Sequence, residues 1–214
     1  MTSLFDALHQ PHVQLFLRLV LGGLLLLAGG SKLANRAAFR GAVAEYKVLP
    51  QKLEAPFAAA LPGAEMALGV LLLLGLGTTI AAALAAPLFL SFGVAIGVNL
   101  ARGRRFDCHC FGAVQRDPIG WPALLRSVAL VLATIVVAVG TSRFGALEFA
   151  LFGSRGDLPP AVEVVPVVFL AAVALNVLIL LPEALAVRAA FARSHATRPT
   201  GHRAHRHALE RRTA

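Results

Sequence analysis

The residues with the clearest potential for chemistry lie in one short segment, residues 102–112. This segment contains the only two cysteines of the chain, Cys108 and Cys110, with His109 between them. Residues two apart point to opposite sides of a helix, and in an extended strand their Cα atoms lie near the upper limit for a disulfide. A bond between these thiols therefore needs a tight turn at His109, and such a small, strained ring is easily reduced. The spacing favours a reversible dithiol and disulfide pair.

Charged side chains near the thiols bear on their reactivity. Those expected to favour the thiolate, which is the nucleophile of disulfide exchange, are Arg102, Arg104, Arg105 and His109. Asp107 opposes them. Two other interpretations stay open. The cysteines are inert loop residues, or they form a metal site with His109, although these ligands are too few and too close together for a closed tetrahedral zinc site.

A working thiol pair also needs a partner for its electrons. The chain has no second cysteine pair that could relay them across a membrane. Exchange therefore requires the thiols of a partner protein or a small electron acceptor such as a quinone.

Composition places this segment in a membrane protein. Of the 214 residues, 57% are hydrophobic and 14% are charged, and the mean hydropathy is +0.74. These values lie outside the range of ordinary soluble domains. The net charge of +9 would suggest nucleic acid in a soluble protein. Here the positive residues lie between and after apolar segments, so we expect them to face the headgroups of the lipid bilayer, with no nucleic acid partner.

Five apolar segments have the length of a bilayer crossing. Residues 66–101 carry no charge, and a single helix of that length would be ~54 Å long, too long for the ~30 Å hydrocarbon core. We therefore expect a hairpin that breaks at residues 75–79. The expected spans are residues 13–33, two spans from near residue 56 to residue 100, residues 122–140 and residues 161–181. The first span has poor signal-peptide features, so we expect it to be retained.

The predicted fold is an all-α integral membrane bundle of four core helices with a fifth, C-terminal span. Its parts are a membrane domain at residues 13–140, the added span at 161–181 and a basic tail at 182–214, interpreted as disordered. Residues 34–55 form a connector expected to lie along the membrane surface. The small residues Gly93 and Gly97 would let another helix approach closely.

Charge bias predicts the orientation of these spans in the plasma membrane. Five spans put the connector counted from Lys32, the loop that carries the cysteines up to Arg116, and the tail on one face, which then holds sixteen of the twenty lysines and arginines. The positive-inside rule makes that face cytoplasmic and leaves the N-terminus outside. This orientation disfavours a disulfide between Cys108 and Cys110, because cytoplasmic thiols are normally kept reduced.

Polar residues within the spans form a second candidate site. A charge inside a span is costly, so Glu65 is a functional hypothesis, entering from the same face as Lys32, Tyr46 and the cysteines. It either makes a structural contact with Lys32 or Tyr46, or handles protons beside the thiols. Lys32 and Arg18 lie near the ends of the first span, where long side chains can reach the interface. Two asparagines are expected to form hydrogen bonds between helices: Asn99 and Asn176.

The chain resembles the MauE family of membrane proteins from methylamine utilisation, related to the DoxX group. The resemblance covers about residues 18–112 and rests on a series of short motifs. These are Gly30-Ser-Lys32, Tyr46-Lys-Val-Leu-Pro50, Leu61-Pro-Gly-Ala-Glu65 with Gly69, Phe92, Asn99-Leu-Ala-Arg-Gly103 and Cys108-His-Cys-Phe-Gly112. The family pattern at the last motif is Cys-Gly-Cys-Phe-Gly, so His109 departs from it and stiffens the turn.

The resemblance implies a membrane protein that works with a thioredoxin-like partner to mature a disulfide-rich methylamine dehydrogenase subunit. Our hypothesis is a thiol–disulfide redox protein, whose standing as an enzyme is open, in which Cys108 and Cys110 exchange. Lys32 and Glu65 would form a buried polar pair behind their loop. The alternative is a small-solute carrier or scaffold subunit that uses Glu65, with incidental cysteines.

Overall fold

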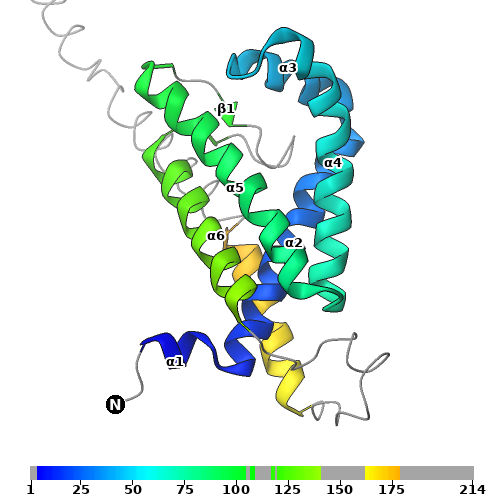
Figure 1. Ribbon diagram of the computed structural model, residues 1–214, viewed down its shortest axis with the longest axis vertical. Helices are drawn as coiled ribbons and strands as arrows, with labels where there is room; N and C mark the ends of the chain where they lie inside the picture. The colour runs from blue at the N-terminus through cyan, green and yellow to red at the C-terminus, as the bar shows by residue number, and fades with distance from the viewer. Residues whose placement is uncertain (1–3, 105–106, 109–116, 119, 141–161, 179–214) are drawn as a thin grey trace, which may run out of the picture. The chain divides into compact units, whose positions relative to one another are not determined.

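The computed structural model describes residues 4–104, 107–108, 117–118, 120–140 and 162–178 (Figure 1). Apart from turns and short connections, these residues are helical, with one short ladder in which β1, Asp107–Cys108, pairs antiparallel with β2, Asp117–Pro118. The all-α fold predicted from the sequence is therefore confirmed.

Within the described parts of the chain, four helices are long and apolar enough to cross a membrane. They are α2 (Pro11–Ala34), α4 (Gln51–Leu74), α5 (Thr78–Ala101) and α6 (Trp121–Val139). The predicted hairpin break is confirmed, because two glycines with positive φ, Gly75 at 69° and Gly77 at 52°, separate α4 from α5. Left-handed backbone of this kind favours glycine and ends the helix.

One boundary differs from the prediction. The second span was expected to begin near Pro56, but α4 begins at Gln51 and runs through both Pro56 and Pro62. Proline removes one backbone donor, yet its fixed φ is compatible with a helix, so the chain continues as a helix through both positions.

A shorter apolar helix, Val162–Leu178, lies where the fifth span was expected. Its Ala171 forms a buried cluster with Val20 and Leu24 of α2. Its described part has 17 residues, against the ~20 that a straight crossing needs, and it is bordered on both sides by residues outside the described ones. The structure thus shows four helices of spanning length among the described residues, and the tail lies outside them.

The four long helices form two close pairs, α2 with α4 and α5 with α6. The pairs meet near the α4–α5 turn, where a core cluster includes Leu21, Leu72, Ala82 and Val137. Toward the other end α4 and α5 diverge, and α3 (Arg36–Tyr46) lies there (Figure 1). The bundle is therefore closed at one end and wedged apart at the other.

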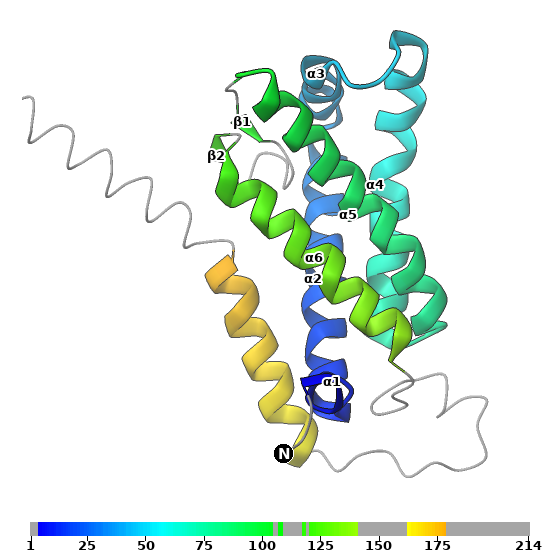
Figure 2. The ribbon, with the colours of Figure 1, turned by 60° about the vertical axis from the view of Figure 1, so that its left-hand side comes forward.

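The wedged end also holds the cysteine segment. Figures 1 and 2 show β1 at the same end of the bundle as α3, while α1 (Leu4–Leu8) lies at the opposite end. The prediction that the connector and the cysteine segment share one end is confirmed. The placement of α3 along a membrane surface stays a prediction.

Candidate functional site

Glycines bring α2 and α4 into close contact. A Cβ at Gly22 would lie 3.0 Å from the carbonyl oxygen of Gly69, and a Cβ at Gly69 would lie 3.0 Å from the carbonyl oxygen of Gly22. A Cβ at Gly29 would lie 2.9 Å from the Pro62 carbonyl oxygen. An approach of 2.9 Å is closer than real Cβ atoms essentially ever come, and 3.0 Å is tighter than nearly all of them, so a larger residue here would push the helices apart. We call this contact, centred on Gly22, Gly29 and Gly69, the glycine seam.

A buried ion pair lies beside the glycine seam. Lys32 Nζ donates to both carboxylate oxygens of Glu65, at 2.7 and 2.9 Å, and both side chains are 0% exposed. Lys32 Nζ also lies 5.5 Å from the ring centroid of Phe39 and 5.1 Å from that of Phe92. The ring faces carry negative partial charge and favour a cation at this distance. The predicted Lys32–Glu65 contact is present, whereas the expectation that Lys32 reaches the interface is wrong.

Two more cations lie within the spans. Arg18, which was also expected to reach the interface, is only 3% exposed and is buried within the bundle. Arg126 of α6, with Ser127, lines a cavity of about 20 Å³ whose wall includes Glu65. A space of this size can hold about one water molecule. Among the described residues the bundle interior is therefore richer in positive than in negative side chains.

Asn99 joins α5 to the end of α3. Its Nδ2 donates to the carbonyl oxygens of Tyr46, at 3.0 Å, and Ala95, at 2.9 Å. Its Oδ1 accepts a hydrogen bond from Arg104 Nη1 at 3.1 Å, and the side chain is fully buried. The predicted interhelical role of Asn99 is thereby confirmed. The prediction for Asn176 is wrong, since this exposed side chain donates to Ala172 of its own helix.

Arg102 reinforces the same junction. Its Nη1 donates at 3.1 Å to the carbonyl oxygen of Lys47, the residue that ends α3 with φ of 48°. Arg102 and Arg104 thus hold the chain against α3 just before it enters the cysteine segment. A guanidinium donor neutralises carbonyl dipoles at a helix C-terminus, so this contact also stabilises α3.

Only some of the residues predicted to act in the cysteine segment are among the described residues. The backbone of Cys108 forms β1, and Cys108 pairs with Asp117. Three other predicted site residues, Arg105, His109 and Cys110, lie outside the described residues. The thiol pair therefore stays a prediction, supported at its entry by the contacts of Arg102 and Arg104.

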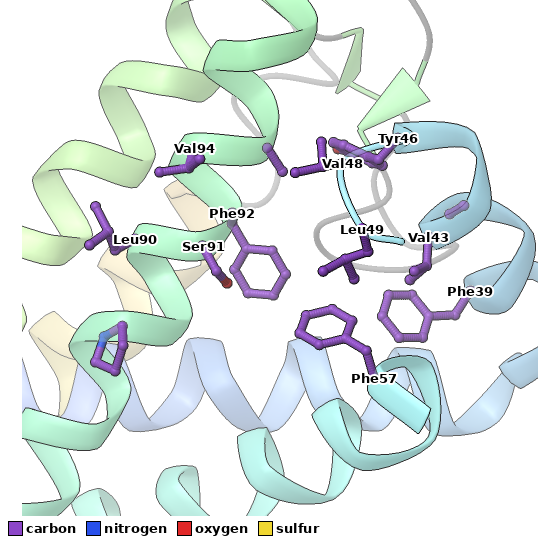
Figure 3. Close-up of a pocket in the computed structure, with 13 residues that line it drawn as sticks. Phe39, Val43, Tyr46, Val48, Leu49, Phe57, Leu90, Ser91, Phe92 and Val94 are labelled. Atoms are coloured by element: carbon purple, nitrogen blue, oxygen red, sulfur yellow. The ribbon is translucent and has the colours of Figure 1, made fainter. Parts of the chain in front are cut away.

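A cavity of about 360 Å³ lies between α3, α4 and α5 (Figure 3). We call it the aromatic cleft, because the rings of Phe39, Phe57 and Phe92 gather around it, with Leu49 above them. Tyr46 also lines it, and burial followed by the nearby charge of Glu45 raises the pKa of Tyr46 to about 12. Phe39 and Phe92 separate the cleft from Lys32.

Sequence reasoning missed the aromatic cleft and the glycine seam. The spacing of Gly22 and Gly29 by seven residues, on one face of α2, was a signal for the seam. The pair Gly93 and Gly97 does face another helix, since a Cβ at Gly93 would lie 3.4 Å from Ser127 of α6. No local sequence pattern predicts the cleft, because the cleft depends on how far α4 and α5 diverge.

Among the described residues, four helices of spanning length, two of which pack through glycines beside an ion pair with no exposed surface, define a multi-pass helical membrane protein. The family model described as methylamine utilisation protein MauE matches residues 10–140, which include all four long helices from the start of α2 to the end of α6. The chain belongs to the MauE family, and the resemblance inferred from its motifs is confirmed.

Curated relatives agree with the family match. The methylamine utilization protein MauE of Paracoccus denitrificans is 36% identical over 136 residues, which are 63% of this chain and 73% of the relative. That of Methylophilus methylotrophus is 39% identical over 132 residues, or 61% and 70%. That of Paracoccus versutus is 32% identical over 166 residues, or 77% and 86%. No solved structure matches this chain.

Proposed function

We propose that this chain is a membrane-embedded thiol–disulfide exchange protein whose working pair is Cys108 and Cys110. The observation that carries the proposal is the anchored entry to the cysteine segment. Arg104 is bound to Asn99, which in turn holds the end of α3. A segment held at its entry can present two thiols to a partner in one orientation, and orientation is a main source of rate in such reactions.

The exchange follows ordinary thiolate chemistry. In the oxidising direction, a thiolate of the client attacks the Cys108–Cys110 disulfide, forms a mixed disulfide and releases the other cysteine of the pair as a thiolate. A second client thiolate then attacks the mixed disulfide. The client gains one disulfide bond, and the pair is left reduced by two electrons. The arginines before Cys108 favour the thiolate that leaves.

The relatives suggest the client. Each is named a methylamine utilization protein. We propose that this chain serves such a system, acting through a thioredoxin-like partner on a disulfide-rich methylamine dehydrogenase subunit. The Lys32–Glu65 pair supports the bundle behind the cysteine segment rather than reacting itself, because both carboxylate oxygens are already bound by Lys32.

Replacement of the thiols tests the exchange function. The chain would be produced in a bacterium that lacks its own MauE protein and depends on methylamine for growth. We expect Cys108→Ser, Cys110→Ser and the double variant to lose complementation while still reaching the membrane. His109→Gly, which restores the family pattern, is the control and should retain growth. Full complementation by the double cysteine variant would refute the proposal.

The carrier alternative is less well supported by the geometry. Glu65 is fully engaged by Lys32, and the cavity beside it has a volume of only about 20 Å³. Growth that survives loss of both cysteines but is abolished by Glu65→Gln would favour the carrier.

We further propose the plasma membrane as the location, with the N-terminus outside and the cysteine segment cytoplasmic, on the charge bias alone. An impermeant maleimide should then label Cys108 and Cys110 only after the cells are permeabilised. Labelling of intact cells would reverse the orientation and bring the thiols to the face where disulfides normally persist.

A further inference from the structure

We propose that the aromatic cleft binds the ring of a membrane quinone, which accepts the electrons of the thiol pair. This inference rests on the proposed exchange function for its redox step, but the binding site itself stands on the geometry of described residues. A volume of about 360 Å³ lies within the ~300–1,000 Å³ typical of small-molecule sites.

The aromatic cleft opens on the lipid-facing side of the bundle. Five of its lining residues are exposed: Pro87 and Ser91, together with three large apolar side chains, Val48 by 37%, Val94 by 50% and Leu90 by 54%. These three side chains belong to a protein whose exposed apolar side chains face lipid. A ligand therefore enters from the bilayer and must be soluble in it.

The cleft walls favour a flat ring over a flexible acyl chain. The rings of Phe39, Phe57 and Phe92 surround the space (Figure 3) and offer faces and edges for offset or edge-to-face packing with a planar ligand. Ser91 lines the same space and donates its hydroxyl proton to the Leu88 carbonyl at 2.7 Å, so its oxygen is left as an acceptor for a quinol hydroxyl. An acyl chain would use neither feature.

Charge behind the wall favours reduction of the ring. Lys32 Nζ lies 5.1 Å from the Phe92 ring centroid and 5.5 Å from that of Phe39, and both rings line the aromatic cleft. Negative charge develops on quinone oxygens as electrons arrive, and the Lys32 cation behind the cleft wall would stabilise it through the low-dielectric interior. Glu65 moderates this field by pairing with Lys32.

The aromatic cleft adjoins the entry to the cysteine segment. Tyr46, a cleft residue, accepts a hydrogen bond from Asn99 through its carbonyl, and Asn99 binds Arg104. The proposed reaction balances without any further reactant. Two S–H bonds of the reduced pair break and one S–S bond forms, while the quinone takes up the two electrons and two protons to become a quinol with two O–H bonds.

Photolabelling tests whether the aromatic cleft holds a quinone. The full-length protein in lipid nanodiscs would be labelled with a photoreactive azidoquinone that carries a short isoprenoid tail, and the labelled peptides would be identified by mass spectrometry. We expect labels on α3 and α5. Ala95→Phe, which fills the cleft, should reduce labelling about tenfold or more. Ala83→Phe, on an exposed part of the same helix, should leave it unchanged.

A second variant distinguishes a ring site from an apolar groove. Phe57→Leu keeps the wall apolar but removes a flat ring, and it should weaken quinone labelling severalfold. An isoprenoid compound without the quinone ring should compete poorly with the probe. The quinone site would be overturned if that compound competed as well as a quinone does. It would also be overturned if a folded Ala95→Phe variant were labelled as strongly as wild type.

The double variant Cys108→Ser/Cys110→Ser separates this inference from the exchange function. It should bind the azidoquinone as wild type does, yet leave a soluble short-chain quinone unreduced. Wild-type protein that binds the quinone but does not reduce it would refute the redox step alone, because the exchange function, which can use the thiols of a partner protein, is decided by the growth of the cysteine variants. Thiol oxidation by quinone at an unchanged rate in Ala95→Phe would instead remove the cleft from the reaction.

Discussion

The glycine seam and the aromatic cleft both involve α4 and differ in packing: helices are in close backbone contact at the seam, and a cavity stays open at the cleft. At the seam, Gly22 and Gly69 let two backbones approach until a Cβ would lie 3.0 Å from the facing carbonyl oxygen. At the cleft, Phe39 of α3 and Phe92 of α5 line a cavity of about 360 Å³ that stays open between α3, α4 and α5. Lipid itself supplies little force to drive helices together. Small residues therefore decide where two helices pack closely, and large rings leave space between them.

The Lys32–Glu65 pair lies at the boundary between these two regions. Glu65 belongs to the seam, where its Cβ is 3.1 Å from the position that a Cβ on Gly29 would occupy. Lys32 instead lies against the rings of Phe39 and Phe92 that form the cleft wall. The comparison therefore predicts strong sensitivity to change at the seam, weaker sensitivity at the junction with α3, and small effects within the cleft.

The largest effect is expected from breaking the ion pair. Lys32→Met or Glu65→Leu alone would leave one buried charge without its partner, and removing one member of such a pair typically costs about 3–5 kcal/mol of unfolding free energy. The double variant removes both charges and should recover most of that loss. Thermal or denaturant unfolding in detergent micelles measures all three.

The double-mutant cycle also checks whether the seam is dry. A coupling energy near zero, with single variants as stable as wild type, would mean that water reaches the two side chains. The seam would then be no less accessible to water than the cleft, and the two regions would not differ in packing.

The next effect should come from widening the seam. In Gly69→Val the new side chain would meet Leu26 Cγ at 2.9 Å and the Gly22 carbonyl oxygen at 3.0 Å, so α2 and α4 must separate. Overpacking of this kind destabilises by about 1–3 kcal/mol. The same unfolding measurement applies.

Two matched variants serve as controls for Gly69→Val. Gly63→Ala lies on the same helix with no atom within 4 Å of the new Cβ, and Ala95→Val adds volume within the cleft. Both should change stability by no more than about 0.5–1 kcal/mol. Equal destabilisation at Gly69 and Ala95 would show that the two regions are packed alike.

Much of the fold could be predicted from the sequence because lipid imposes strict rules on length and charge. The run without charge from residue 66 to 101 had to contain a break, and Gly75 and Gly77 are the residues that form it. The start of α4 differs from the prediction, which places a boundary at Pro56, because proline is tolerated in membrane helices. The buried pair was predictable because a carboxylate in a span requires a cation, and parity left Lys32 as a candidate.

The remainder of the site depends on tertiary structure that no local pattern encodes. Phe39 and Phe92 are 53 residues apart in the sequence, and their approach to Lys32 follows from the placement of α3 between diverging helices. The burial of Arg18 likewise depends on what packs around α2. Sequence periodicity indicates which face of a helix is apolar but not how far two helices separate along their length.

A smaller effect is expected where α3 joins α5. Asn99→Leu removes the donor to the Tyr46 carbonyl and the acceptor of Arg104, and the loss of a hydrogen bond of this kind typically costs about 1 kcal/mol. Because the contact holds the end of α3, amide hydrogen exchange should increase in α3 while it stays unchanged in α2. An equal change in exchange rate in α2 and α3 would mean that α3 is held mainly by its apolar contacts and not by Asn99.

The smallest effect concerns the dryness of the cleft wall, and Tyr46 reports it. Burial, with the charge of Glu45 as a second cause, raises the pKa of Tyr46 to about 12, against about 10 in an unfolded chain. The native state therefore keeps its proton when the unfolded state has lost it. The resulting stability is fully present below about pH 10 and is lost as the pH rises through about 12.

Tyr46 is the only tyrosine of the chain, so a tyrosinate absorbance titration reports this residue alone. We expect a midpoint near 12 in the native protein and near 10 in denaturant. Relative to Tyr46→Phe, the wild type should lose stability only between those pH values. A native midpoint near 10 would mean that water wets the cleft wall, and an apolar ring would then have little reason to bind there. The titration thus tests, without any ligand, whether the open side of α4 is as dry as the closed one.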